Sequence, residues 1–255
     1  MRGTWIIFLK EMRSYFKSPI AYILLASYTF IFGLFFVLNL NFAIRSSMQM
    51  QFQMHPSTTN VNEQVIAPLL RTVGVISLFF IPLITMRLFS EEKRNGTIEL
   101  LATSPVRDIE VILGKWLAAW AFYGCLLLVG SLNLIFLIVY SKPDWKPMLL
   151  GYFGVMLLTG CMLAIGIFIS SLTRNQIIAA VVTFCVYLVL WLISSMEDLG
   201  SSVFASALAY LSMMSHLDSF IRGTVETKVL IFYLSFTFLA LFFTDRYLES
   251  LRWRS

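Results

Sequence analysis

Six long runs of apolar residues constrain the fold of this chain more than any other feature of its sequence. A helix needs about 20 apolar residues to cross the hydrocarbon core of a bilayer, and it satisfies its own backbone hydrogen bonds there. The pattern therefore predicts an all-α integral membrane protein with six transmembrane helices. The fifth and sixth runs are short for a span, so their ends are the least sharply defined. The predicted spans are residues 20–41, 68–88, 116–139, 148–169, 177–194 and 229–244.

The composition points to the same class. Hydrophobic residues make up 58% of the chain and charged residues 13%, and the mean hydropathy is +0.81, whereas a soluble domain has about 45–50% apolar and about 25% charged residues. These values exclude a soluble enzyme and a disordered chain, and 255 residues leave room for one membrane domain over 1–255. The net charge of +5 does not indicate a nucleic-acid partner, because the basic residues flank the apolar runs instead of forming one patch.

The segments between the runs differ in their content of Lys and Arg. Thirteen of the 19 basic residues lie in the first 19 residues, between spans two and three, after span four, and in the C-terminal tail. The positive-inside rule then places these segments, and both termini, in the cytoplasm. We therefore expect a multi-pass protein of the cytoplasmic (inner) membrane.

The leader, residues 1–19, has the pattern of an amphipathic helix. Positions 10, 13, 14 and 17 form a basic and polar face, while Ile6 and Ile7 break the pattern. Such a helix suits the membrane interface, and Pro19 fits a bend into the first span; the alternative is a frayed leader that only sets topology. The opposite, apolar face contains Trp5, Phe8, Leu9, Met12, Tyr15 and Phe16.

The sequence lacks the groups that most membrane enzymes and ion-coupled transporters need. The centres of the spans contain no Asp, Glu, Lys or His, the two histidines and three cysteines form no metal-binding or disulfide pattern, and no nucleotide-binding loop precedes Gly114-Lys115. We therefore expect no catalytic, cofactor or metal site in this chain, and any energy input must come from a partner. Small residues four apart in span four, Gly160 with Ala164 and Gly166 with Ser170, indicate close helix packing within one subunit or, alternatively, a dimer face.

The cytoplasmic segment 89–115 is the most informative part of the sequence. Asn95-Gly96 breaks a helix that continues inward from span two, and Thr97 can cap a short helix with apolar side chains, while Ser104-Pro105 marks the start of another. An exposed short helix with Ile and Leu suits docking to a partner; the alternative is a solvated hairpin. On the other side of the membrane, the long segment 195–228 either forms short helices that dip into the outer leaflet or is a simple amphipathic loop.

The run from Glu91 to Leu101, followed by Thr103-Ser-Pro105-Val and by Glu110 and Gly114-Lys115, resembles the hallmark of ABC-2 type exporter permeases. The leader, the order of the six spans and the long outer segment 195–228 after the fifth span resemble that family too. Within it, the chain is most similar to short permeases of gliding-motility and nitrous-oxide-reductase-maturation systems.

The resemblance implies the ABC-2 permease fold, with the leader as its elbow helix, the segment near 90–104 as a coupling helix, and the segment near 197–226 as short outer helices. It also implies two copies of a separate ABC ATPase that carries ATP and Mg, a second identical or related permease chain, and a possible outer accessory protein. In this reading the acidic pair Glu91-Glu92 and the basic pair Lys93-Arg94 would steer docking. Ile98, Leu100 and Leu101 would form the buried contact, and Gly96 would allow the bend. The residues expected to couple to the ATPase are Glu91, Glu92, Lys93, Arg94, Gly96, Thr97, Ile98, Glu99, Leu100, Leu101, Thr103 and Pro105.

Two functions remain from this reasoning. In the first, the chain moves a substrate across the membrane with ATP hydrolysed by its partner. In the second, it is a non-transporting module that transmits the conformational change of the ATPase to an outer protein.

Overall fold

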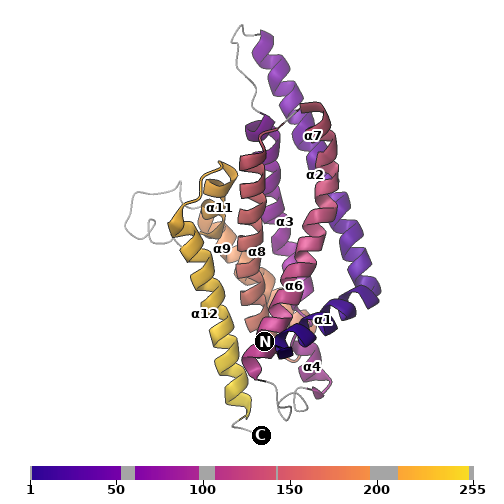
Figure 1. The fold of residues 1–255 in the computed structure, drawn as a ribbon, viewed down its shortest axis with the longest axis vertical. Helices are drawn as coiled ribbons and strands as arrows, with labels where there is room; N and C mark the ends of the chain where they lie inside the picture. Colours follow the sequence, from indigo (N-terminus) through magenta and orange to yellow (C-terminus); the bar gives the residue numbers. More distant parts are fainter. Residues whose placement is uncertain (1, 53–60, 98–106, 142, 196–211, 253–255) are drawn as a thin grey trace.

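The computed structural model describes residues 2–52, 61–97, 107–141, 143–195 and 212–252. Within these ranges the chain is helical, and six helices are long and apolar enough to cross a membrane, as expected. Both termini lie at the end of the bundle drawn lowest in Figure 1, which we call the lower end. The helices are α1 (Arg2–Lys17), α2 (Pro19–Phe52), α3 (Ala67–Thr85), α4 (Ser90–Arg94), α6 (Asp108–Ser131), α7 (Ile135–Ser141), α8 (Trp145–Leu172), α9 (Gln176–Ser195), α11 (Met213–Ile221) and α12 (Thr227–Arg252), with a π-helical turn η1 (Asn62–Ile66) and a 3-10 turn η2 (Leu132–Leu134).

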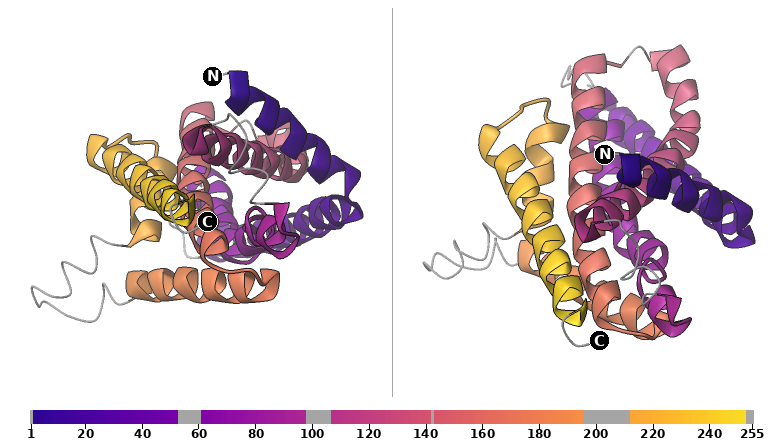
Figure 2. Two further views of the ribbon diagram at one scale, coloured as in Figure 1. Left: turned by 90° about the horizontal axis from the view of Figure 1, so that it is seen from below. Right: turned by 60° about the horizontal axis from the view of Figure 1, so that its bottom comes forward.

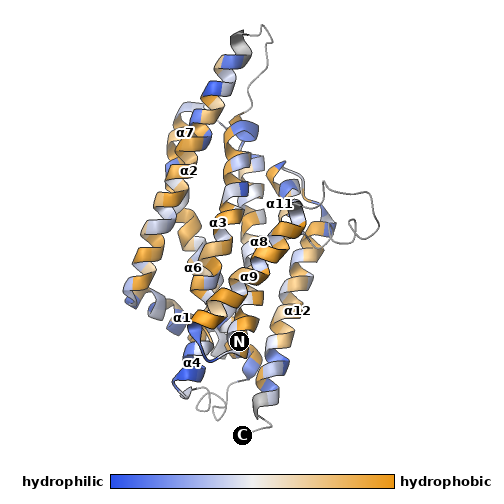
Figure 3. Ribbon diagram, turned by 180° about the vertical axis from the view of Figure 1, so that it is seen from behind, coloured by the Kyte–Doolittle hydropathy of each residue, from blue (hydrophilic) through white to orange (hydrophobic). Residues whose placement is uncertain are grey.

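The helices extend beyond the predicted spans. The last one runs over Thr227–Arg252 instead of 229–244, and α2 continues to Phe52, beyond the predicted end of the first span at residue 41. Helical hydrogen bonding does not stop where apolarity stops, so an apolar run marks the part that suits lipid and not the ends of the helix. In Figure 3 hydrophobic colour dominates the middle of the bundle, while hydrophilic colour appears in the upper part of α2 and the lower part of α12.

Two of the predicted spans contain breaks. The third run, 116–139, is interrupted by η2, and the second helix ends at Thr85, before residue 88. We expected the second helix to continue straight to Asn95-Gly96. Pro82 does not cause this break, since its carbonyl oxygen still accepts the helical bond from the Met86 N–H at 2.9 Å; residues 86–89 form a turn before the separate helix α4 begins at Ser90.

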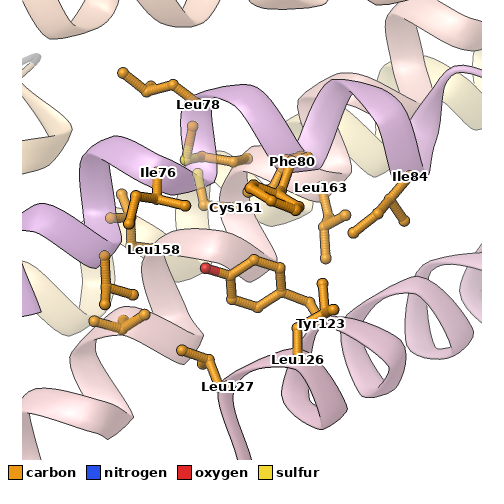
Figure 4. Close-up of a cluster of buried hydrophobic side chains, with 14 of the residues drawn as sticks. Ile76, Leu78, Phe80, Ile84, Tyr123, Leu126, Leu127, Leu158, Cys161 and Leu163 are labelled. Carbon is orange, nitrogen blue, oxygen red and sulfur yellow. The ribbon is translucent and has the colours of Figure 1, made fainter. Parts of the chain in front are cut away.

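Helices α3 and α8 form the centre of the bundle. Helix α8 packs against α3, α6, α9, α11 and α12, and α2 packs against α3 and α6. Figure 4 shows their shared apolar core, in which Tyr123 of α6 points between Ile76 of α3 and Leu158 of α8. Helices α2, α9 and α12 expose most of their apolar surface.

The small residues of span four lie inside the subunit. A Cβ on Gly160 would lie 3.1 Å from the indole nitrogen of Trp120, and one on Gly166 would lie 2.6 Å from the hydroxyl of Thr85. The indoles of Trp116 and Trp120 also donate to backbone carbonyl oxygens of α8, at 2.9 and 2.8 Å. These contacts confirm that the small residues of span four allow close helix packing within one subunit.

The opposite, upper end carries α11, a short helix in the described part of the long segment 195–228. Its apolar side chains are buried against α3 and α8, and Asp218 pairs with Arg71 of α3 at 2.7 Å. A Cβ on Gly154 of α8 would meet Phe220 at 2.6 Å. The short helix therefore packs on the bundle, while residues 196–211 of the same prediction lie outside the described residues.

Candidate functional site

The helix α4 begins the predicted coupling segment. Acidic Glu91 and Glu92 occupy its first turn and basic Lys93 and Arg94 its last, which complements the helix dipole at both ends. The helix ends at Arg94 with Asn95 as its C-cap, and Gly96 has a φ of +71°, in the left-handed region that favours glycine. The expected break at Asn95-Gly96 is therefore present. The expected docking residues Ile98, Glu99, Leu100, Leu101, Thr103 and Pro105 lie outside the described residues.

A serine of α8 holds the turn between α3 and α4. The hydroxyl oxygen of Ser170 accepts hydrogen bonds from the backbone N–H groups of Phe89 and Ser90, at 3.2 and 3.3 Å, and its hydroxyl donates to the carbonyl oxygen of Met86 at 3.3 Å. These bonds satisfy backbone groups that the broken helix cannot pair internally. The direction of α4 is therefore fixed by the centre of the bundle.

The buried ammonium of Lys115, whose side chain is 2% exposed, joins three helices at the lower end. Its Nζ lies 2.7 Å from Glu92 Oε1 of α4 and 3.3 Å from Glu11 Oε1 of α1, and it donates to the Leu88 carbonyl oxygen at 2.6 Å. The ring of Phe89 lies 5.0 Å from the same nitrogen. A buried charge is tolerated only when it is paired and hydrogen-bonded, so this cluster requires α1, α4 and α6 to be in place together.

A second basic residue ties α4 to the end of α12. Lys93 Nζ lies 4.5 Å from the centre of the Tyr247 ring, 3.2 Å from its hydroxyl oxygen, and within hydrogen-bond distance of the Ser171 carbonyl oxygen. Glu92 and Lys93 thus face the bundle, whereas Glu91 and Arg94 are exposed.

Thr97 follows the turn at residues 95–96, and its hydroxyl donates to the Glu92 carbonyl oxygen at 3.3 Å. The backbone N–H groups that its side chain would cap lie outside the described residues. The capping role of Thr97 therefore stays a prediction.

Helix α1 lies across the lower end and packs on α6 (Figure 2). Tyr15 is buried and stacks on Phe122 at 4.7 Å, and Ile7 touches the backbone of α6 at Gly114. Ile7, which we expected to break the pattern, thus belongs to the packed face. Burial, and then the nearby Glu11 carboxylate, raise the pKa of the Tyr15 hydroxyl, so it stays protonated. Phe8 and Met12 are half-buried, while Trp5, Leu9 and Phe16 are exposed.

A polar hollow of about 490 Å³ separates α1 from α4. Glu11, Arg87, Glu91, Glu92 and Lys115 are among the residues that line it. Because acidic and basic groups are mixed there, the hollow has no strong charge of one sign.

Sequence reasoning singled out α4 but did not predict which residues hold it: it gave no such role to Lys115 or Ser170, which it named for other reasons, or to Glu11 and Tyr247. Two features of the sequence could have indicated these contacts. Glu11 is the single acidic residue of a basic leader, and Lys115 stands at the start of an apolar run. Within the described ranges no group of three or more His, Cys, Asp or Glu residues is placed to hold a metal. The arrangement is suited to transmitting a displacement of α4 to α1, α6, α8 and α12.

One comparison with known proteins identifies a family for the chain. A family model described as "ABC-2 family transporter protein" matches residues 5–237, a range that contains the whole cluster except Tyr247. No curated protein sequence matches the chain.

Proposed function

Because the chain belongs to the ABC-2 family of transporter proteins, we propose that it is a membrane-spanning permease subunit that moves a substrate with ATP hydrolysed by a separate subunit. Membership of this family implies an ABC ATPase as partner. The proposal includes two ATPase copies, a second permease chain, no enzyme activity in the chain itself, and both termini in the cytoplasm. The sequence resemblance further favours a short permease of the gliding-motility or nitrous-oxide-reductase-maturation type.

The observation that carries the proposal is the attachment of α4 to four other helices. A force on the segment after Gly96 acts first on α4, which is joined to α1 and α6 through Lys115 and to α8 and α12 through Lys93. In the proposed cycle, ATP binding closes the two ATPases, each pulls the docked segment near 90–104, and the spans shift between two packings that open to opposite sides.

The proposed contact with the ATPase has a polar and an apolar part. The exposed charges of Glu91 and Arg94 steer the encounter, as charges at the edge of an interface do. Ile98, Leu100 and Leu101 supply the buried contact, with Glu99, Thr103 and Pro105 in the same segment.

The first experiment is purification of the tagged chain from its native membranes in mild detergent, followed by identification of the proteins that accompany it. We expect a stoichiometric ATPase with its own nucleotide-binding loop. The double variant Leu100→Asp/Leu101→Asp should insert normally and lose this partner, whereas Val225→Asp, at an exposed apolar residue of the upper end, should keep it. Normal ATPase binding by the double variant, or a chain that purifies alone even after crosslinking, contradicts the proposal.

The alternative function is transmission of the ATPase movement to an outer protein without transport. Helix α2 supports it, because its 34 residues extend about 51 Å, well beyond the roughly 30 Å that a span requires. The projecting part of α2 offers a surface for such a protein. Reconstitution of the complex in vesicles separates the two functions: ATP-dependent flux of a labelled substrate supports transport, and ATP-dependent conformational change without flux supports transmission.

A further inference from the structure

The fold separates the charges of α1 onto opposite faces. Glu11, the single acid of this helix, turns inward to Lys115. Lys10, Arg13 and Lys17 are exposed, and none of the three forms an ion pair with another described residue. The helix therefore presents three exposed positive charges outside any such pair; Lys10 also lines the hollow between α1 and α4 with Glu91 and Glu92, whereas Arg13 and Lys17 do not line it.

Apolar side chains accompany these charges. Trp5 and Ile6 are 60% and 66% exposed, and Leu9 and Phe16 are also exposed. A free surface that combines basic with large apolar groups is typical of helices that lie in the boundary between lipid headgroups and acyl chains.

The position of α1 fits the same boundary. Viewed along the bundle in Figure 2, α1 lies lengthwise across its lower end. It turns into α2 at Ser18, where Ser18 N–H donates to the Tyr15 carbonyl oxygen at 3.1 Å. The first turn of α2 immediately exposes Ile20 and Ile23. The basic face of α1 thus lies beside the start of a lipid-facing span.

We propose that α1 binds the headgroups of anionic phospholipids through Lys10, Arg13 and Lys17, with its exposed apolar side chains among the acyl chains. Each Lys or Arg close to an anionic surface adds attraction that corresponds to about a fivefold gain in association. Glu11 then links this lipid contact to Lys115 and α4, so the lipid composition influences how firmly α4 is held. The inference goes beyond the proposed function and does not depend on an ATPase partner.

The test uses the full chain purified in detergent without its ATPase. Phosphatidylglycerol or phosphatidylcholine is titrated in, while the thermal midpoint and, by native mass spectrometry, the number of retained lipids are measured. We expect phosphatidylglycerol to raise both values for the unmodified chain. The triple variant Lys10→Gln/Arg13→Gln/Lys17→Gln should require at least tenfold more phosphatidylglycerol for the same effect.

The matched control neutralises three exposed basic residues of the upper end, Lys146→Gln/Arg222→Gln/Lys228→Gln, and should respond like the unmodified chain. An unchanged response of the first variant overturns the proposal, and so does an equal loss in the control, which would indicate non-specific attraction. ATPase binding of the first variant is measured separately, by the copurification described above. If this variant loses the ATPase but keeps its response to phosphatidylglycerol, the basic face docks the ATPase instead, and the proposal is overturned.

Discussion

At the scale of single residues, Lys115 is the point where α1, α4 and α6 meet. Its replacement by Met leaves two carboxylates, Glu11 and Glu92, in a largely buried site without their cation. Breaking a buried ion pair in this way costs about 3–5 kcal/mol. We therefore expect Lys115→Met to lower the thermal midpoint of the detergent-purified chain strongly.

Two comparisons make this prediction specific. Lys228→Met, at an exposed lysine of the upper end, should leave the midpoint nearly unchanged. Adding Glu11→Gln and Glu92→Gln to Lys115→Met should restore part of the loss, since the uncompensated charges are then gone. If the triple variant is less stable than the single one, the charge-pairing explanation is wrong.

Two tyrosines with buried hydroxyl groups provide a second residue-scale prediction. The hydroxyl of Tyr152 has no hydrogen-bond partner among the described residues, whereas that of Tyr233 donates to the Met213 carbonyl oxygen at 2.7 Å. Removing an unsatisfied group is close to neutral or stabilising, and removing a satisfied one costs about 1 kcal/mol. Tyr152→Phe should keep or raise the thermal midpoint, and Tyr233→Phe should lower it; the reverse order would refute the assignment.

At the scale of elements, the contact between α3 and α8 depends on a glycine. A Cβ on Gly166 would lie 2.6 Å from Thr85 Oγ1 and 2.9 Å from Thr85 Cβ, so Gly166→Ala must push the two helices apart. Overpacking of this kind costs about 1–3 kcal/mol. At Gly124 the same Cβ would meet only the flexible end of Met156, at 3.4 Å, so Gly124→Ala should be tolerated. Equal thermal midpoints for the two variants would show that α8 can move aside.

At the scale of the whole molecule, the bundle predicts which residues share a side of the membrane. Asn95 lies at the lower end with both termini, and Glu63 in η1 lies at the upper end. In a background without the three native cysteines, Glu63→Cys should react with a membrane-impermeant maleimide in intact cells, and Asn95→Cys only after the cells are opened. The opposite pattern would invert the orientation that the basic residues predict.

How far the sequence predicts this molecule depends on the range of the interactions. The six spans could be predicted because lipid requires each run to be apolar along its own length, and the end of α4 could be predicted because Asn95 and Gly96 act locally. The contact of Lys115 with Glu11 joins residues 104 positions apart, and the contact of Gly166 with Thr85 depends on how α3 and α8 pack. Neither is encoded in a local pattern, so the support of α4 became visible only in three dimensions.

The way in which α4 is held also has a consequence for the synthesis of the chain. The ribosome completes α4 long before the groups that fix it, because Ser170 follows Phe89 by 81 residues and Tyr247 follows Lys93 by 154. A nascent chain therefore carries α4 without its final supports until the last span has been translated and inserted. A truncated chain without Tyr247 cannot form the contact between Lys93 and Tyr247. The position of α4 is therefore fixed only when the polypeptide is complete.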